Sequence, residues 1–320
     1  MTRVLVTGAS GFVGSVLCPM LASVGYVVRA AVRAGSAAPE GIAERITIGE
    51  IDGRTDWTEA LRGVELVIHL AARAHVLDDS AQAAVLYAET NANGTQRLAA
   101  AAARCGVRRF IFLSTVKVNG EESADHAYTS DDPPDPQDVY GRSKWQAERH
   151  LWEIAASAGM QADVVRAPLV YGPGVRANFL RLLRWVDHER PLPFGAVHNR
   201  RSLVSAWALC DLLIRLLDHP AAVNRTWMVS DGEDISTSEL VRRIAAAMGR
   251  RAWLLPVPPR ALRLAGRLLG RGAEMRRLCG SLTVDSTVTR AILGWAPPLS
   301  MGEALMRTVQ WYRSQVCPSS

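Results

Sequence analysis

Short runs of aliphatic and β-branched residues alternate with longer helical segments through the first half of the chain, and this alternation constrains the fold most. The runs are nearly continuous in Val, Ile and Leu, which is typical of strands that are covered on both faces. Strand, helix, strand repeated in this order predicts a doubly wound parallel sheet. The expected strands are Arg3–Val6, Val27–Val32, Arg45–Ile48, Leu66–His69, Arg109–Leu113 and Ala162–Arg166, and the clearest helices are Asn93–Arg104 and Lys144–Ser157.

The pattern changes near residue 171, where prolines and arginines interrupt it and helices dominate to the end. A chain of 320 residues is long enough for about two lobes. We therefore predict an α/β domain over residues 1–170 and a smaller, mainly helical lobe over residues 171–320. Within the second lobe, residues 202–217 are expected to return to the side of the large sheet.

Composition excludes several classes of protein. With 48% hydrophobic and 21% charged residues, the chain is globular rather than disordered or coiled-coil. The net charge of +6 suits an anionic partner, but aromatic residues make up only 6% and the basic residues are dispersed, so we expect no nucleic-acid partner. Five widely spaced cysteines indicate no disulfide framework or zinc site, and no apolar stretch is long enough to span a membrane. The chain opens on a strand rather than a signal peptide, and a reduced, cytoplasmic protein is expected.

A glycine loop follows the first strand and opens a helix. The glycines permit a tight turn and let the backbone approach a pyrophosphate, whose charge the helix N-terminus favours. The spacing is Gly-x-x-Gly-x-x-Gly, and an ordinary strand–helix turn is the alternative reading. The expected cofactor-binding residues of this loop are Gly8, Ser10, Gly11, Phe12, Val13 and Gly14.

A tyrosine and a lysine, Tyr140 and Lys144, lie four residues apart at the start of an expected helix and therefore face one direction. A lysine cation beside a phenol favours the phenolate, so we expect Lys144 to lower the pKa of Tyr140 toward the range of a general acid or base. Thr115, at the end of a core strand, is placed to hold a substrate oxygen against that phenol. These three residues are the predicted catalytic set.

The end of the second strand bears on the choice of cofactor. NAD enzymes of this type usually place an acidic residue there, where it accepts hydrogen bonds from the ribose hydroxyls. Here Val32 takes that place and Arg33 follows, so a guanidinium is available for a 2′-phosphate and no carboxylate is expected to oppose it. This favours NADP(H), with NAD(H) possible, although Arg33 also fits an ordinary loop arginine.

Several further motifs accompany these residues, and together they give the chain a family resemblance. They are His69-Leu70-Ala71-Ala72, Asn91-Ala92-Asn93-Gly94-Thr95, Leu113-Ser114-Thr115, Arg166-Ala167-Pro168, Tyr171-Gly172-Pro173-Gly174, Leu293-Gly294-Trp295 and Trp311-Tyr312. With the glycine loop, Tyr140 and Lys144, the chain resembles the extended short-chain dehydrogenases/reductases of the NAD-dependent epimerase/dehydratase family, over almost its whole length. The resemblance implies a Rossmann domain that binds a nicotinamide cofactor and a lobe that binds a nucleotide sugar.

The resemblance also implies roles for individual residues. Tyr140 would be the acid/base, Lys144 would bind the nicotinamide ribose, and Thr115 would orient the substrate. The remaining cofactor-binding positions would be Glu50, Ile51, Leu70, Ala71, Ala72, Asn91 and Pro168. Glu50 stands where the family usually has Asp, and Ala167 stands where a second proline is common.

Substrate-binding residues follow from the same resemblance. Asn178 and Arg201 would hold the diphosphate of a UDP-sugar, and a guanidinium fork matches a phosphate chemically. Arg176 and Arg200 are weaker candidates. Lys117 would contact the sugar or phosphate, with an exposed structural lysine as the alternative. His69 reads as a packing residue, and no His-Glu-x-x-His pattern indicates a metal.

Among activities of this family, four further segments, residues 114–120, 174–179, 191–195 and 199–204, most resemble UDP-4-keto-6-deoxy-N-acetylhexosamine 4-reductases of lipopolysaccharide (O-antigen) biosynthesis. This branch borders on proteins named UDP-glucose 4-epimerases. We expect a reductase, with a redox-neutral 4-epimerase carrying tightly bound NAD as the alternative. A non-catalytic NAD(P)-sensing protein is more distant, because both Tyr140 and Lys144 are present. A homodimer is expected.

One segment is not explained by this function. Residues 259–270 carry Arg260, Arg263 and Arg267 at helical spacing beside apolar residues, which are Leu262, Leu264, Ala265, Leu268 and Leu269. A basic amphipathic helix of this kind either packs its apolar side on the core or rests on a membrane surface, and the first reading is the more common.

Overall fold

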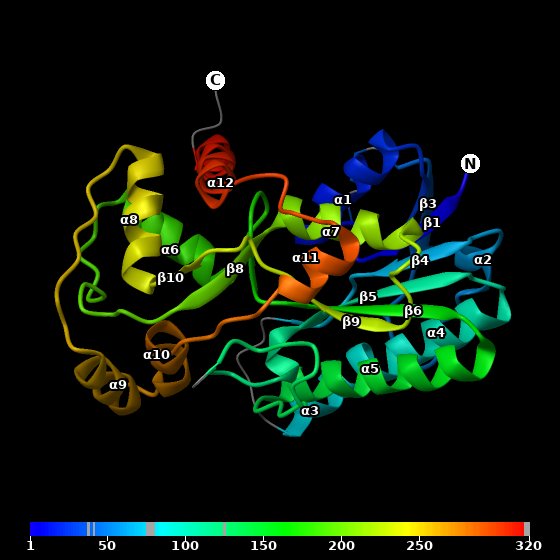
Figure 1. The fold of residues 1–320 in the computed structure, drawn as a ribbon, viewed down its shortest axis with the longest axis horizontal. Coiled ribbons are helices and arrows are strands. Elements are labelled where there is room, and N and C mark those ends of the chain that lie inside the picture. The colour runs from blue at the N-terminus through cyan, green and yellow to red at the C-terminus, as the bar shows by residue number, and fades with distance from the viewer. Residues whose placement is uncertain (37–38, 41, 75–80, 124–125, 317–320) are drawn as a thin grey trace.

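A computed structural model describes residues 1–36, 39–40, 42–74, 81–123 and 126–316. Its larger part is built on a seven-stranded sheet in which every neighbouring pair is parallel, in the order β3-β2-β1-β4-β5-β6-β9 (Figure 1). The strands are β1 (Arg3–Thr7), β2 (Val27–Arg33), β3 (Glu44–Ile48), β4 (Leu66–His69), β5 (Arg109–Thr115), β6 (Gln161–Ala167) and β9 (Arg225–Met228). The predicted doubly wound α/β fold is confirmed.

Helices cover both faces of this sheet, as the continuous apolar strands require. On one face, α1 (Phe12–Ser23) and α7 (Ala206–Asp218) pack with the sheet around buried residues such as Leu17 and Leu213. On the other face, α2 (Thr58–Leu61), α4 (Gly94–Arg104) and α5 (Val139–Ala158) enclose a second core. Figure 1 shows α1 and α7 above the sheet, with α4 and α5 below it.

Three shorter helical elements also lie in this part of the chain. They are α3 (Ala81–Tyr87), a π-helical stretch (Ala88–Asn93) that continues into α4, and a 3-10 turn (Val116–Val118) after β5.

The observed strands differ from the predicted ones in a few places. Strands β5 and β6 each extend beyond their predicted limits. Strand β9 was not predicted, because it has only four residues and lies in the otherwise helical half of the chain.

The second half of the chain supplies a separate core. A small sheet has the order β10-β8-β7, with β8 parallel to β7 and antiparallel to β10. The elements of this part are β7 (Leu169–Tyr171), α6 (Ala177–Asp187), β8 (Arg201–Ser205), β10 (Asp234–Ile235), α8 (Thr237–Met248), α9 (Pro259–Leu268), α10 (Gly272–Cys279) and α12 (Met301–Val316). Helix α11 (Thr287–Leu293) instead packs Leu293 into the core beside the large sheet. Buried side chains of α6, α8 and α12 pack together, including Leu183, Ile244 and Leu305.

The chain crosses between the two parts more than once. Strand β8 belongs to the small sheet, whereas α7, which follows it directly, packs against α1 beside the large sheet. Later the segment before α11 forms isolated bridges from Leu282 to Arg201 and from Val284 to Tyr128. Among the described helices, none is long and apolar enough to cross a membrane.

Candidate active site

The carboxyl ends of parallel strands meet at one edge of a sheet, and residues that follow such ends form the usual ligand site of a doubly wound fold. Here the glycine loop follows β1, residues 70–72 follow β4, and Thr115 ends β5. Residues from these three ends build the candidate site.

The backbone of the glycine loop is packed so tightly that two of its positions leave no room for a side chain. Gly8 has φ +66°, and a Cβ there would lie 2.8 Å from the backbone nitrogen of Ala71. A Cβ at Gly14 would lie 2.4 Å from the carbonyl oxygen of Gly8. Side chains at either position would therefore disrupt the turn, and the bare backbone before α1 fits a pyrophosphate.

The neighbouring predicted residues complete this cradle in different ways. Ser10 is exposed, while Phe12 and Val13 turn inward and pack against the two adjoining cores. Ala71, between Leu70 and Ala72, donates its backbone N–H to the Thr7 hydroxyl at 3.3 Å, which fixes the segment after β4 against the loop.

The predicted environment of Arg33 was wrong in one respect. Arg33 is the last residue of β2, and its Nη1 lies 3.5 Å from Oε1 of Glu50, with both side chains exposed. A carboxylate therefore does stand beside the guanidinium, contrary to expectation, and would oppose a 2′-phosphate. Ile51, which follows Glu50, is buried against Gly94 and fixes the loop after β3.

Tyr140 and Lys144 lie in the first two turns of α5, as the spacing predicted. Asp138 caps this helix and accepts the backbone N–H of Gly141 at 2.6 Å. Lys144 is only 2% exposed, and its Nζ lies 3.9 Å from the ring centroid of Phe112. Burial lowers the pKa of Lys144 to about 7, and the Glu148 carboxylate opposes this shift.

The expected effect of Lys144 on the tyrosine is not what the surrounding groups produce. Burial raises the pKa of Tyr140 above its ordinary value, and Asp138 and Tyr87 raise it further. The Tyr87 ring lies 6.0 Å from the Tyr140 ring. Burial and these two neighbours act in the same direction, so the side chains around Tyr140 favour the neutral phenol.

Thr115 ends β5 and is 9% exposed; its Oγ1 accepts the backbone N–H of Lys117 at 3.3 Å. Next to it, Ser114 donates its hydroxyl to Glu148, which is fully buried and pairs with Arg166 at 2.6 Å. This network ties β5 and β6 to α5 on the side of Lys144. Pro168 is buried just after β6.

Asn91 connects another element to the same helix. Its side chain is 1% exposed, donates from Nδ2 to the hydroxyl of Ser143 at 2.9 Å, and accepts the backbone N–H of Arg73 at 2.8 Å. Ser143 in turn donates to the carbonyl oxygen of Tyr140 at 2.8 Å. Asn91 thus holds the start of α5 against the segment that follows β4.

Lys117 and Arg201 belong to a charged cluster beside the start of α5. The Lys117 ammonium pairs with Glu121 at 3.0 Å and with Asp138, and Arg277 reaches Oε1 of Glu121 at 3.3 Å. Arg201 donates from Nη1 to the carbonyl oxygen of Arg277 at 2.6 Å. Arg201 therefore supports the cluster through a hydrogen bond to the backbone of Arg277. Lys117 is partly buried, and both of its ion-pair partners are carboxylates of this cluster.

Arg277 was not predicted from the sequence. It belongs to α10, far along the chain from Tyr140, and its buried Nε has no hydrogen-bond partner in the described part of the chain. Its signal was the basic pair Arg276-Arg277, but nothing in the spacing ties that pair to α5. Asn178 is not brought into this cluster by any contact of its own, since its exposed side chain accepts from Arg181 at 3.2 Å. Arg200 pairs with Asp234 at the surface.

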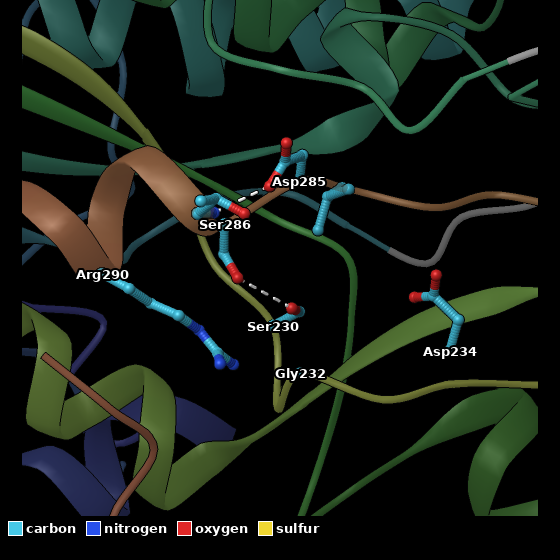
Figure 2. Close-up of a pocket in the computed structure, with 8 residues that line it drawn as sticks. Ser230, Gly232, Asp234, Asp285, Ser286 and Arg290 are labelled. Carbon is cyan, nitrogen blue, oxygen red and sulfur yellow. Dashed lines mark hydrogen bonds between the residues drawn. The ribbon is translucent and has the colours of Figure 1, made fainter.

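A separate polar pocket lies between the end of β9 and the start of α11 (Figure 2). Arg290 extends toward Gly232 on one side, while the Ser230 and Ser286 hydroxyls are 3.2 Å apart on another. Asp234 and Asp285 also line it, so its charge is mixed. None of the predicted site residues lines this pocket.

His69 is fully buried, with its ring nitrogens 2.6 Å from the Thr7 hydroxyl and 3.0 Å from the Thr95 hydroxyl. Burial lowers the pKa of its imidazole to about 3. Among the described residues, no three His, Cys, Asp or Glu side chains gather as a metal site.

Comparison with known proteins agrees with this geometry. A family described as "NAD dependent epimerase/dehydratase family" matches residues 4–230. A UDP-glucose 4-epimerase of Vibrio cholerae is 42% identical over 96% of this chain and 94% of its own length. An N-acetyl-alpha-D-glucosaminyl-diphospho-ditrans,octacis-undecaprenol 4-epimerase of Escherichia coli O157:H7 is 26% identical over 97% and 95%. The structure of MoeE5 in complex with UDP-glucose and NAD has a TM-score of 0.80, with 27% identity, and covers 98% of this chain and 99% of its own.

Proposed function

Because the chain belongs to the NAD-dependent epimerase/dehydratase family of enzymes acting on nucleotide sugars, we propose that it inverts the configuration at C4 of a UDP-sugar in a redox-neutral cycle with NAD. The observation that carries this proposal is the 42% identity with a 4-epimerase over nearly the full length of both chains, joined to the retained Thr115, Tyr140 and Lys144.

The expected 4-ketoreductase receives no specific support, and the comparisons favour the alternative over it. The preference for NADP(H) is likewise unsupported, since NAD is the dinucleotide bound in MoeE5. We set the non-catalytic alternative aside, because the chain belongs to a family of enzymes and retains both Tyr140 and Lys144 in α5.

The residues present fit a dinucleotide. The bare backbone around Gly8 and Gly14 would hold the pyrophosphate, and Glu50 beside Arg33 suits an unphosphorylated ribose. Asn91 holds the adjoining helix in place, and Lys144 would bind the nicotinamide ribose. When bound, NAD supplies a group that accepts a hydride from C4 and returns it to the other face of the ketone.

In this mechanism Tyr140 takes the proton from the sugar O4 and later returns it. Thr115 donates a hydrogen bond to the same oxygen and keeps it against the phenol. Because the side chains around Tyr140 raise its pKa, the phenolate has to be favoured by groups that arrive with the ligands, and a positively charged ligand nearby would act in that direction.

The charged cluster gives the diphosphate a place. Lys117 and Arg277 are held by Glu121 and Asp138, and a diphosphate would compete with these carboxylates for the same cations. Arg201 would keep the backbone of Arg277 in position. Asn178 remains a proposed contact at the start of α6.

Two assays of the purified enzyme test the proposal. UDP-glucose and UDP-N-acetylglucosamine are incubated without added cofactor, and the C4 epimers are separated by chromatography; the cofactor released by denaturation is identified by mass. Epimers that reach equilibrium, with NAD recovered from the protein, support the proposal. Stoichiometric oxidation of added NADPH by a 4-keto sugar, with no epimer formed, would contradict it.

We further propose a cytoplasmic homodimer whose residues 171–320 bind the sugar, except that α7 (Ala206–Asp218), within the expected range 202–217, completes the large domain. A role in making surface polysaccharide is supported by the E. coli relative, whose name describes a lipid-linked sugar as its substrate.

A further inference from the structure

Helix α9 (Pro259–Leu268) presents an apolar face to solvent instead of burying it. The helix touches the rest of the molecule through Leu262 and Gly266, and a Cβ at Gly266 would lie 2.4 Å from Cγ of Met275 in α10. These two positions share one side of the helix, since they are four residues apart.

The opposite side of α9 is also apolar. Leu264 is 59% exposed, Leu268 is 80% exposed, and Leu269 just beyond the helix is 75% exposed. Ala261 and Ala265 lie between them and are exposed as well. Large aliphatic side chains exposed to this extent on adjacent turns mark an interaction site rather than ordinary surface.

Arginines border this apolar side. Arg260, Arg263 and Arg267 recur at intervals of three and four residues, and Arg271 follows. Residues 250–273 contain six arginines and no acidic residue, so the charge of this segment, +6, equals the net charge of the whole chain. In the described part of the chain, Arg260, Arg263 and Arg267 form no ion pair or side-chain hydrogen bond, in contrast to most surface arginines of this protein.

We propose that α9 docks on the surface of a bilayer that contains anionic lipids. We define the α9 face as Ala261, Leu264, Ala265, Leu268 and Leu269 together with Arg260, Arg263, Arg267 and Arg271. Its leucines enter the boundary between headgroups and acyl chains, and its arginines contact the lipid phosphates.

Charge decides between this occupant and a second copy of the chain. A twofold interface places the same patch against itself, so Arg260, Arg263 and Arg267 of two copies would meet, and only the flanking Arg271 has a carboxylate partner, Glu274, in the described part of the chain. An anionic lipid surface neutralises the same row. Figure 1 places α9 at the end of the molecule farthest from the large sheet, where a bilayer can approach it.

The α9 face is also connected to the candidate site. Helices α9 and α10 pack on each other, and α10 carries Arg277 of the charged cluster. Docking would therefore hold the substrate side of the molecule near the lipid surface, whichever UDP-sugar the enzyme uses.

Vesicle co-sedimentation tests the proposal with the full-length protein. Vesicles of phosphatidylcholine alone are compared with vesicles containing phosphatidylglycerol, at low and high salt. We expect binding to the anionic vesicles that salt weakens, and about a fivefold loss of the partition coefficient for each arginine removed from the face. Leu264→Asp with Leu268→Asp should abolish binding.

Matched controls separate docking from general charge. Arg260→Gln, Arg263→Gln and Arg267→Gln are combined and compared with Arg62→Gln, Arg149→Gln and Arg242→Gln combined, which change net charge equally at arginines paired with glutamates. Met306→Asp, at another exposed apolar residue, is the control for the leucines. Unchanged turnover and melting temperature verify folding.

Binding that only the α9 variants lose supports the proposal. Three outcomes would overturn it: no binding to anionic vesicles, equal losses in the α9 and control variants, or a dimer that Leu264→Asp with Leu268→Asp converts to monomer in solution.

Discussion

Tyr140 illustrates how far a single residue depends on its surroundings. The spacing of Tyr140 and Lys144 correctly placed both on one side of a helix, but the pKa of Tyr140 is raised by burial, Asp138 and Tyr87 instead of being lowered. Lys144 packs against Phe112 and its own pKa falls to about 7, so it is a weak source of positive charge. A sequence pattern gives proximity but not burial, and burial dominates here.

The first prediction concerns the proton at O4. Tyr140→Phe should lower kcat by roughly a hundredfold or more while NAD remains bound, because it removes the hydroxyl that exchanges the proton. Turnover and cofactor content are measured on the same preparation. Near-normal turnover would remove Tyr140 from the proposed role.

The second prediction separates the two arginines of the charged cluster. Arg277→Ala should weaken UDP binding by about tenfold to a hundredfold, because a guanidinium leaves the diphosphate site. Arg201→Ala should weaken UDP binding too, and should also lower the melting temperature, since Arg201 supports the carbonyl oxygens of Arg277 and Gly280. Calorimetry with UDP and thermal melts measure both effects. Equal UDP affinity in wild type and Arg277→Ala would show that the cluster is not the diphosphate site.

The third prediction concerns the cofactor. Glu50→Gln frees the Arg33 guanidinium from its exposed partner, and it should raise affinity for NADP by up to about fivefold, the scale of an exposed ion pair. Affinity for NAD should change little. Dissociation constants of both dinucleotides are compared, with Glu59→Gln, another exposed partner of an arginine, as the control. An unchanged ratio would place Glu50 and Arg33 outside the ribose site.

At the scale of elements, the apolar runs were enough to predict the six strands that precede residue 168. Short runs of Val, Ile and Leu that are separated by glycine turns and helices indicate buried parallel strands and few other structures. Strand β9 escaped because Arg225–Met228 is short and pairs only at the sheet edge with β6. The charged cluster around Lys117 could not be predicted, because it joins segments that are distant in sequence and are brought together only by tertiary packing.

The edge of the sheet at β6 and β9 carries the fourth prediction. Asp163 is buried and accepts the Trp227 indole N–H at 2.9 Å, while its Oδ2 has no partner among the described residues. Burial raises the pKa of Asp163 to about 6 from its ordinary 3.8. The folded state therefore holds this proton more tightly than the unfolded state, so its contribution to stability is present below pH 4 and is lost as pH rises through 6.

Asp163→Asn removes that titration. Wild type should lose up to about 3 kcal/mol of unfolding free energy relative to the variant between pH 4 and pH 7. Urea unfolding at several pH values measures the difference, and Asp131→Asn, at an exposed aspartate, is the control. A difference between wild type and Asp163→Asn that stays constant with pH would mean that Asp163 is ionised throughout.

At the scale of the whole molecule, the two lobes meet where the chemistry is proposed. The large sheet supplies the glycine loop, Thr115 and the start of α5, and the second lobe supplies Arg201 and Arg277. The chain crosses between them at β8, α7 and the segment before α11. A ligand that contacts both lobes would therefore stabilise the molecule as a unit, which is consistent with a cofactor and a UDP-sugar sharing one site.

In the proposed cycle, a hydride leaves C4 and returns to C4 within one turnover. A UDP-hexose deuterated at C4 is incubated with the enzyme in ordinary water without added cofactor, and the product is examined by NMR and mass spectrometry. We expect an epimer of inverted configuration that keeps its deuterium at C4, with the bound NAD unchanged after many turnovers. Loss of the deuterium, or no epimer without added NADPH, would contradict it.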